Sequence, residues 1–503
     1  MRIIEAAGAA ALLLVPVVGA RPAAAASTDT LVVCDDVQDP MTLDPQKEFS
    51  EKNHVLLQQA YESLVRFDAD GRIVPSLAVS WERLGPLRLR FKLRRGVRFH
   101  DGEPFDSRAV VYTIERYLDP AVNFPGRPFL GPIEKAEAVD AETVDIVTAA
   151  PDGILLNRLA WLLQILAPDF IKNNGEAALQ TRTAGTGPFK LESWDRGRQI
   201  TYVRNEDHWR KPGPSIRRLI FRFIPVDAQV DALLDGRVDL LTDLPGLASM
   251  RVRKAGMRVL QAPSFYTSAA SYDVSRPPMS DLRVRKALNM AIDREELVRY
   301  DAHGSGTPLA TLTMPGEGGH DDSLKPYRYD PKEARKLLKE AGYPNGFKLK
   351  VFVKVQAART FSILSAMLAR IGVQTEATEF TDAELLDGVK AQNWDMMFGS
   401  CPDPMYSTYF IQAIFLYSRS PFAKLKDPEY DRRLEQAAAT VDPARRDAAF
   451  ADLDRYMYDN ALVVSTYQRM RTLGAAPGVD FAPSLSGVYY FDRASWRAPN
   501  AHD

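Results

Sequence analysis

Histidines, hydroxyl side chains and glycine-rich turns are where catalytic or metal chemistry would be sought in this 503-residue chain. None of its six histidines lies in an HExxH pattern or pairs with a cysteine at zinc-site spacing. The stretch His320-Asp321-Asp322 is more typical of a solvated turn than of a metal site. Ser305 in GSGTP and Thr186 in GTGPF lack the pattern of a nucleophile elbow, and Gly185 and Gly187 lack the lysine and serine of a phosphate loop. The sequence therefore predicts no enzyme, no metal site and no cofactor.

The elements that would position any site alternate between strand and helix, which predicts an α/β protein with mixed sheets. Strands are predicted over 30–33, 88–93, 139–148, 217–224, 348–353 and 373–379. Helices are predicted over 53–64, 153–166, 228–235, 362–371, 430–439 and 443–460. Asp281, Asp293, Asp330 and Asp442 each precede a helical pattern and are predicted N-caps.

The N-terminal 26 residues have the pattern of a secretory signal peptide. Arg2 supplies the positive end, 6–20 the apolar core and 23–26 a small-residue cleavage site. An uncleaved anchor is the alternative, and the cleavage region has no cysteine for a lipid anchor. The net charge of −1 gives no indication of a nucleic-acid partner, and 26% charged with 46% hydrophobic residues is typical of a soluble globular protein. We therefore expect a soluble protein exported to a periplasm.

The two cysteines, Cys34 and Cys401, are too few for a disulfide framework. Cys34 ends an apolar run and is predicted to be a buried thiol. Export would permit a disulfide, provided that the two Cα atoms come within about 7 Å of each other. The sequence leaves open whether both thiols are free.

Residues 96–116, GVRFHDGEPFDSRAVVYTIER, carry the most informative pattern. A short strand leads into a turn, and a helix begins at Asp106 or Ser107 with Val110, Val111 and Ile114 on one face. The sequence of this segment closely resembles a signature of the periplasmic solute-binding proteins of peptide-type ABC importers (the dipeptide-, oligopeptide- and nickel-binding family, family 5). Six further segments resemble the same family in the same order: 183–194, 203–219, 226–241, 277–297, 329–347 and 394–404.

This resemblance implies a two-lobed periplasmic-binding-protein fold with mixed sheets and a subdomain inserted into lobe I. Lobe I is expected to comprise 27–70, 186–265 and 470–503, the inserted subdomain 71–185, and lobe II 266–469. The resemblance further implies a monomer that captures a small peptide or peptide-like solute in the interlobe cleft and delivers it to an ABC permease in the inner membrane. An opine, a metal chelate, haem or an oligosaccharide is the alternative solute, and a secreted hydrolase or chaperone on a similar scaffold is the alternative of another class.

The segment WDMMFGSCPDP, 394–404, departs from the family where the resemblance places the ligand's amino terminus. Asp403-Pro404 matches, but Ser400 stands where peptide-binding members have the aspartate that meets the ammonium group. Either Asp403 or Asp273 is then expected to supply the counter-charge, or the solute has no free amino terminus there. Replacing Asp273 by asparagine is expected to weaken binding more than the same change at Asp403, which its own turn should hold.

Aromatic residues near both lobe crossings are candidate walls of the cleft, although a core role is an equal alternative for each. Lys354 and Arg359 are the basic candidates for an anionic end of the solute, with a solvated role as the alternative. The full set of candidate ligand-binding residues is Tyr266, Tyr272, Asp273, Arg359, Ser400, Cys401, Asp403, Met405, Tyr406 and Tyr409.

Overall fold

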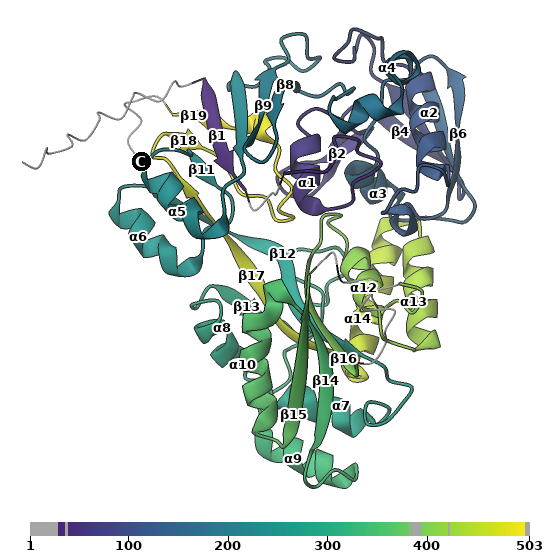
Figure 1. Cartoon of the computed structure of the whole chain (residues 1–503). Helices are drawn as coiled ribbons and strands as arrows, with labels where there is room; N and C mark the ends of the chain where they lie inside the picture. Colours follow the sequence, from purple (N-terminus) through teal and green to yellow (C-terminus); the bar gives the residue numbers. More distant parts are fainter. Residues whose placement is uncertain (1–28, 36–38, 382–383, 385–393, 421–422, 498–503) are drawn as a thin grey trace, which may run out of the picture.

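The computed structural model describes residues 29–35, 39–381, 384, 394–420 and 423–497. Figure 1 shows a two-lobed α/β molecule, as predicted. The predicted signal peptide lies outside the described residues. Within the described part, no helix combines the length and the apolar character needed to cross a membrane.

An 11-stranded mixed sheet runs through both lobes. Its strands are β1 (Thr30–Cys34), β8 (Phe189–Asp195), β9 (Gln199–Arg204), β10 (Arg218–Arg222), β11 (Leu240–Leu241), β12 (Arg258–Tyr272), β13 (Gly306–Pro308), β14 (Phe347–Lys354), β15 (Val373–Phe380), β16 (Met396–Pro402) and β17 (Val463–Ala475). The order is β15-β14-β16-β12-β17-β11-β1-β10-β9-β8, with β13 paired to β17. Strand β1 is parallel to β10 and β11, and β14 is parallel to β15 and β16. Lobe I is the part around β1, and lobe II is the part around β14.

The antiparallel strands β12 and β17 cross from one lobe to the other (Figure 1). Residues 258–263 of β12 pair with 470–475 of β17 in lobe I, and 267–271 pair with 463–468 in lobe II. The register shifts between Pro263 and Thr267, where the proline lacks a backbone N–H for the ladder. This interruption is where the crossing strands are best able to bend. The predicted boundary after residue 265 falls within it.

The inserted subdomain consists of a four-stranded antiparallel sheet and three helices. The strands β4 (Ala78–Gly85), β5 (Arg88–Leu93), β6 (Ile133–Asp140) and β7 (Thr143–Thr148) have the order β4-β5-β7-β6. The helices are α2 (Ser107–Leu118), α3 (Leu155–Leu162) and α4 (Pro168–Asn174). Helix α2 begins at Ser107, one of the two predicted start positions, and Asp106 caps it, because its side chain accepts a hydrogen bond from the Arg108 N–H.

The remaining elements cover the sheets and close the chain. They are α1 (Glu51–Leu57), β2 (Val65–Phe67), β3 (Ile73–Pro75), α5 (Val226–Leu234), α6 (Ser249–Lys254), α7 (Leu282–Met290), α8 (Arg294–Tyr300), α9 (Pro331–Glu340), α10 (Ala358–Ala369), α12 (Thr408–Leu416), α13 (Pro428–Ala439), α14 (Pro443–Asp459), β18 (Val479–Asp480) and β19 (Ser495–Trp496). The predicted caps of α7, α8, α9 and α14 each accept a hydrogen bond from a backbone N–H in the first turn.

Three predicted elements differ from what the sequence pattern indicated. The helix predicted over 53–64 ends at Leu57, because the backbone just beyond it bonds to another segment: Ala60 O accepts from Gly187 N at 2.9 Å. The strand predicted over 139–148 is two strands, β6 and β7, joined by a turn in which Asp140 accepts from Glu142 N at 2.8 Å. The helix predicted over 153–166 is confined to 155–162.

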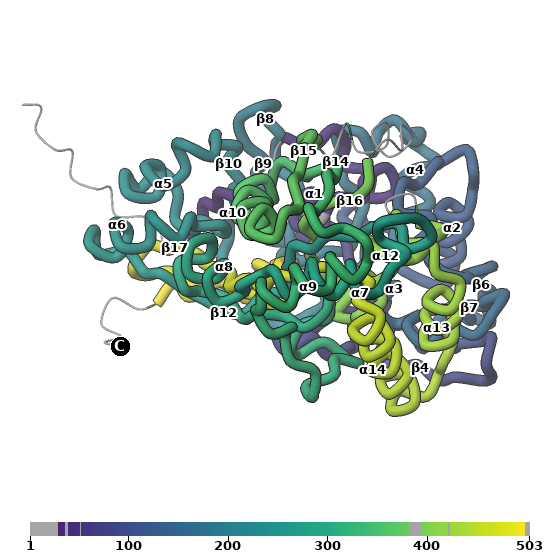
Figure 2. Tube along the Cα trace, turned by 90° about the horizontal axis from the view of Figure 1, so that it is seen from below, coloured from purple at the N-terminus to yellow at the C-terminus, as the bar shows by residue number. Residues whose placement is uncertain are grey.

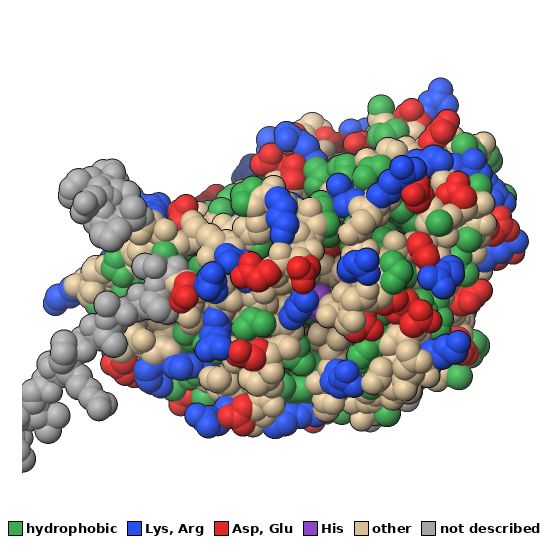
Figure 3. Space-filling view, turned by 90° about the horizontal axis from the view of Figure 1, so that it is seen from above, with side chains coloured by type: hydrophobic (Ala, Val, Ile, Leu, Met, Phe, Trp, Pro, Cys, Tyr) green, Lys and Arg blue, Asp and Glu red, His purple; other side chains and the backbone are tan. Residues whose placement is uncertain are grey.

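Buried apolar side chains connect the parts of the molecule. One cluster lies within lobe II, between its sheet and helices α7 to α10. A larger cluster runs from lobe I through the inserted subdomain and into helices α12 to α14. Figure 2 shows α13 and α14 beside the inserted subdomain, at the end of the molecule away from α5 and α6. The face in Figure 3 carries acidic and basic side chains intermixed, consistent with the small net charge.

Candidate functional site

Three polar residues come together where the strands cross between the lobes. Tyr266 on β12 donates its hydroxyl hydrogen to Ser400 Oγ on β16 at 2.7 Å. The guanidinium carbon of Arg469 on β17 lies 4.9 Å from the centroid of the Tyr266 ring. Ser400 is buried, Tyr266 is half-buried and Arg469 is exposed. We call these three residues the crossing-strand site.

Arg469 was not among the predicted site residues. Its backbone is held in the crossing, because its carbonyl oxygen accepts from Ser264 Oγ at 2.8 Å. The surrounding protein partly desolvates the guanidinium, which works to lower its pKa, but Tyr266 and Asp243 outweigh this effect and the pKa is raised. Arg469 is therefore a fixed positive charge. Its position one residue before the predicted lobe boundary at 470 was the available signal in the sequence.

Asp403 is fully buried and its carboxylate is directed into its own turn. Oδ1 accepts from Met405 N at 2.8 Å and Oδ2 from Ser407 N at 3.1 Å. The buried Glu317 lies beside it. Burial raises the pKa of Asp403 to about 7, and burial together with the Asp403 charge raises that of Glu317 well above its ordinary value. Asp403 thus lies inside the lobe rather than facing a solute.

Two of the predicted site residues, Tyr272 and Asp273, lie away from the crossing-strand site. Tyr272 is fully buried and donates its hydroxyl hydrogen to the Ala461 carbonyl. Asp273 follows it, seven residues beyond Tyr266, which is about 23 Å along an extended strand. Its carboxylate accepts from Ser275 N at 2.9 Å. Tyr272 and Asp273 are therefore not part of the proposed site, because they lie too far along the chain from the crossing.

Arg359 is on the surface of lobe II, with its guanidinium 3.3 Å from an Asp301 carboxylate oxygen. Cys401 and Met405 are buried in the core, where the Met405 carbonyl accepts from Asn157 Nδ2 at 2.8 Å. Cys34 is also buried, and the structure joins neither cysteine in a disulfide. Of the predicted set, the structure brings Tyr266 and Ser400 together directly.

Aromatic residues of lobe II contact lobe I and the inserted subdomain. The Tyr406 ring lies 4.6 Å from that of Phe67, between centroids, and packs so closely on Gly71 that a Cβ there would lie 2.0 Å from it. The Arg158 guanidinium lies 4.6 Å from the Tyr409 ring centroid. Tyr406 and Tyr409 therefore bridge the lobes.

Phe410 and backbone groups extend this bridge. The Phe410 ring lies 5.1 Å from both Phe129 and Trp161, between centroids. Gly153 N donates to Ala438 O at 2.7 Å, and a Cβ on Gly153 would lie 1.9 Å from Thr440 O. We call the surface formed by Gly153, Asn157 and Arg158 against residues 405–410 and 438–440 the interlobe contact. Because it is tight and apolar at its centre, the lobes are closed on this side.

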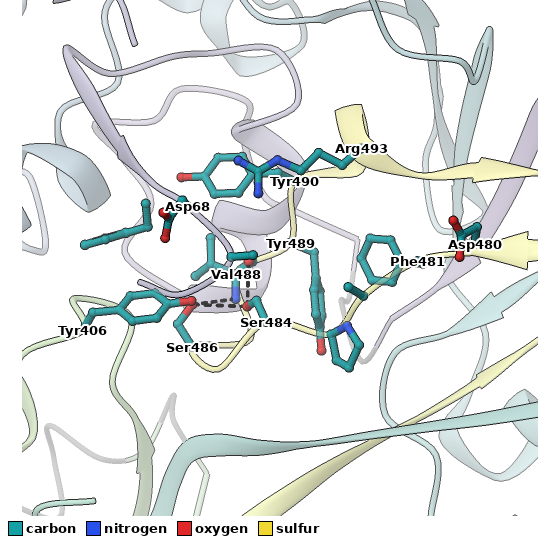
Figure 4. A pocket seen from close by; sticks show the side chains of 14 residues that line it. Asp68, Tyr406, Asp480, Phe481, Ser484, Ser486, Val488, Tyr489, Tyr490 and Arg493 are labelled. Atoms are coloured by element: carbon teal, nitrogen blue, oxygen red, sulfur yellow. Dashed lines mark hydrogen bonds between the residues drawn. The ribbon is translucent and has the colours of Figure 1, made fainter. Parts of the chain in front are cut away.

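A cavity of about 230 Å³ lies beside the interlobe contact (Figure 4). Residues 67–69 and 480–493 of lobe I line it, with Tyr406 from lobe II. Figure 4 shows Ser484, Ser486 and Val488 bonded to one another: Ser484 Oγ donates to Val488 O at 2.9 Å. These hydroxyls thus support the loop. Sequence reasoning identified Tyr406 but missed the lobe I lining, for which the adjacent tyrosines Tyr489 and Tyr490 were the available signal.

The described residues include no group of three or more His, Cys, Asp or Glu side chains placed to hold a metal ion. The arrangement instead presents an arginine, two hydroxyl groups and aromatic walls between two lobes. Such groups can bind a solute and fix its orientation.

Comparison with known proteins places this geometry in a family. The model of "Bacterial extracellular solute-binding proteins, family 5 Middle" matches residues 72–421. The glutathione-binding protein GsiB of Escherichia coli O1:K1 is 28% identical over 344 residues, 67% of each chain. The structure of DppA from Helicobacter pylori with the peptide STSA superimposes with a TM-score of 0.80 at 23% identity, covering 93% of this chain and 98% of that one. NikA from Brucella suis with Fe(III)-EDTA gives a TM-score of 0.82 at 24% identity, covering 93% and 100%.

These matches extend over both lobes and the inserted subdomain, in agreement with the seven sequence segments that carried the resemblance. The chain belongs to family 5 of the bacterial extracellular solute-binding proteins.

Proposed function

We propose that this protein is the periplasmic binding component of an ABC importer and that it captures a peptide or peptide-like solute between its lobes. The observation that carries the proposal is the crossing-strand site, where Tyr266, Ser400 and Arg469 lie at the interrupted ladder of β12 and β17. Similarity to a glutathione-binding protein and to a peptide complex supports the peptide class.

The mechanism is closure of the lobes around the solute. The interlobe contact forms in the closed arrangement, and a bound solute that touches both lobes favours that arrangement over an open one. The closed protein would then dock on the inner-membrane permease. The protein acts as a monomer in this proposal.

A non-peptide solute is the second candidate. Ser400 supplies no charge to an amino terminus, and a fold neighbour in this family was solved with an iron chelate. An opine, a metal chelate, haem or an oligosaccharide would use the same closure.

Mass spectrometry of molecules that co-purify with the protein identifies the solute, and its addition then tests the function. A solute at 100 times its Kd stabilises the folded protein by about 2.7 kcal/mol, so the melting temperature should rise. Small-angle scattering should show a smaller radius of gyration, and the solute should be recovered chemically unchanged. Chemical conversion of the solute would contradict the proposal.

A further inference from the structure

The crossing-strand site holds a positive charge with no negative group in contact. The Arg469 guanidinium makes no hydrogen bond or ion pair with any residue that the structure describes, apart from its position over the Tyr266 ring. Its side chain is exposed, although β17 passes through the middle of the molecule at this point. A guanidinium has five N–H donors in a planar fork that matches a carboxylate or phosphate.

The charged groups around Arg469 leave this charge unbalanced. Asp243 is exposed and near enough to raise the pKa of Arg469, but no ion pair within 4.0 Å joins them. Asp403 is directed into its own turn. Arg471 also lies nearby and works to lower the pKa of Arg469. The Arg469 guanidinium therefore has no carboxylate in contact among the described residues.

The two hydroxyl groups of the site complement the arginine. Tyr266 donates to Ser400 Oγ, which leaves the Ser400 hydroxyl hydrogen available to a third group. An ammonium group at this place would face the Arg469 guanidinium with no carboxylate in contact, and removing it from water would be costly.

We propose that the crossing-strand site receives an anionic oxygen group of the solute, a carboxylate or a phosphate, bound by Arg469 and assisted by Ser400. This inference rests on the proposed solute-binding function and names the charge of the solute at one place in the cleft. For a peptide, the carboxyl end rather than the amino end would lie at the strand crossing.

The test uses the full mature protein and a defined probe set. The set contains a pool of synthetic tripeptides without acidic side chains, prepared as free acids, as C-terminal amides and as N-acetylated free acids, together with glycerol 3-phosphate. Thermal shift and calorimetric titration give the affinities. The variants are Arg469→Gln and Arg469→Lys, and Arg253→Gln on α6 is the matched control because it removes one exposed arginine charge far from the crossing.

For the parent we expect both free-acid pools to bind, and the amides to bind about 10- to 100-fold more weakly. Arg469→Gln should lose that discrimination, Arg469→Lys should keep part of it, and Arg253→Gln should match the parent. The melting temperature of each variant without solute shows that it is folded. Binding of glycerol 3-phosphate alone, lost in Arg469→Gln, would assign the anion as a phosphate and exclude the peptide.

Two results would overturn the inference while leaving the binding function intact: equal affinity for acids and amides, or unchanged affinity in Arg469→Gln. If no probe stabilises the parent protein, the proposed peptide-binding function fails, and the inference that depends on it fails with it. Binding of the probes to the parent protein therefore tests the proposed function, and the affinities of the variants test the charge of the solute.

Discussion

At the scale of single residues, Asp403 and Glu317 form a buried pair of carboxyl groups. Asp403 holds the turn that contains Tyr406, because it accepts hydrogen bonds from the backbone on either side of that residue. Both side chains are removed from water, and no cation among the described residues affects the pKa of either carboxyl group. Asp454 lies near enough to Glu317 to raise its pKa further. Because two adjacent carboxylates without a cation cannot both ionise cheaply, a proton is retained between them at neutral pH.

We predict that the protein loses stability as pH rises towards and beyond 7. The pKa of Asp403 is raised to about 7 and that of Glu317 higher still, whereas both lie near 4 in an unfolded chain. The folded state thus binds more protons, so this stability is fully present below about pH 4 and is lost as pH rises through 7, at about 1.4 kcal/mol per pH unit for each proton. Melting temperatures from pH 5 to 9 measure it.

The variant Glu317→Gln keeps the shape of the pair and removes one titrating group. Its melting temperature should fall less steeply with pH than that of the parent. Glu333→Gln, on the exposed face of α9, is the control and should follow the parent curve. Parallel curves for the parent and Glu317→Gln would contradict the shared proton.

At the scale of elements, helix α12 joins lobe II to the inserted subdomain through Phe410. This ring is buried between Phe129 and Trp161 in the closed arrangement. Truncating a buried phenylalanine costs about 3–5 kcal/mol. Because this burial depends on closure, the cost should fall mainly on the equilibrium between closed and open lobes.

We therefore predict that Phe410→Ala increases the radius of gyration of the solute-free protein and weakens solute binding. Phe361→Ala is the matched control, since Phe361 is buried within lobe II alone. It should lower the melting temperature and leave the radius of gyration unchanged. Equal radii for Phe410→Ala and the parent would show that the interlobe contact does not hold the lobes closed.

The elements also show which structural features the sequence could predict. The caps Asp106, Asp281 and Asp293 were predictable because a cap depends on residues within one turn of it. The end of α1 was not, since it depends on a bond from Gly187 to Ala60, 127 residues away. A pattern of residues close in sequence cannot predict a hydrogen bond to a partner so far away in the chain.

The candidate site follows the same rule. The family resemblance identified Ser400, which lies in a recognisable segment, and Tyr266 was proposed as one of the aromatic residues near a lobe crossing. Arg469 has no motif around it, and its relation to Tyr266 spans 203 residues and depends on the crossing of β12 and β17. Tyr272 and Asp273 were assigned to the cleft because their position along β12 was not visible in the sequence.

At the scale of the whole molecule, Cys34 lies in lobe I on β1 and Cys401 in lobe II on β16, and both are buried thiols outside a disulfide. We predict that a thiol reagent reacts with two thiols per chain in denaturant and far more slowly in the native protein. A reducing agent should leave the melting temperature unchanged. Fewer than two reactive thiols in denaturant would indicate a disulfide.

The path of β17 through both lobes affects the order in which the lobes fold. Lobe II is formed by one continuous stretch of chain, whereas the sheet of lobe I needs both β1 near the start and the last residues of β17 near the end. Contacts so distant in sequence form slowly. We expect pulse-labelled hydrogen exchange during refolding to protect lobe II amides first, so that lobe I stays unfinished until the C-terminal strand is available.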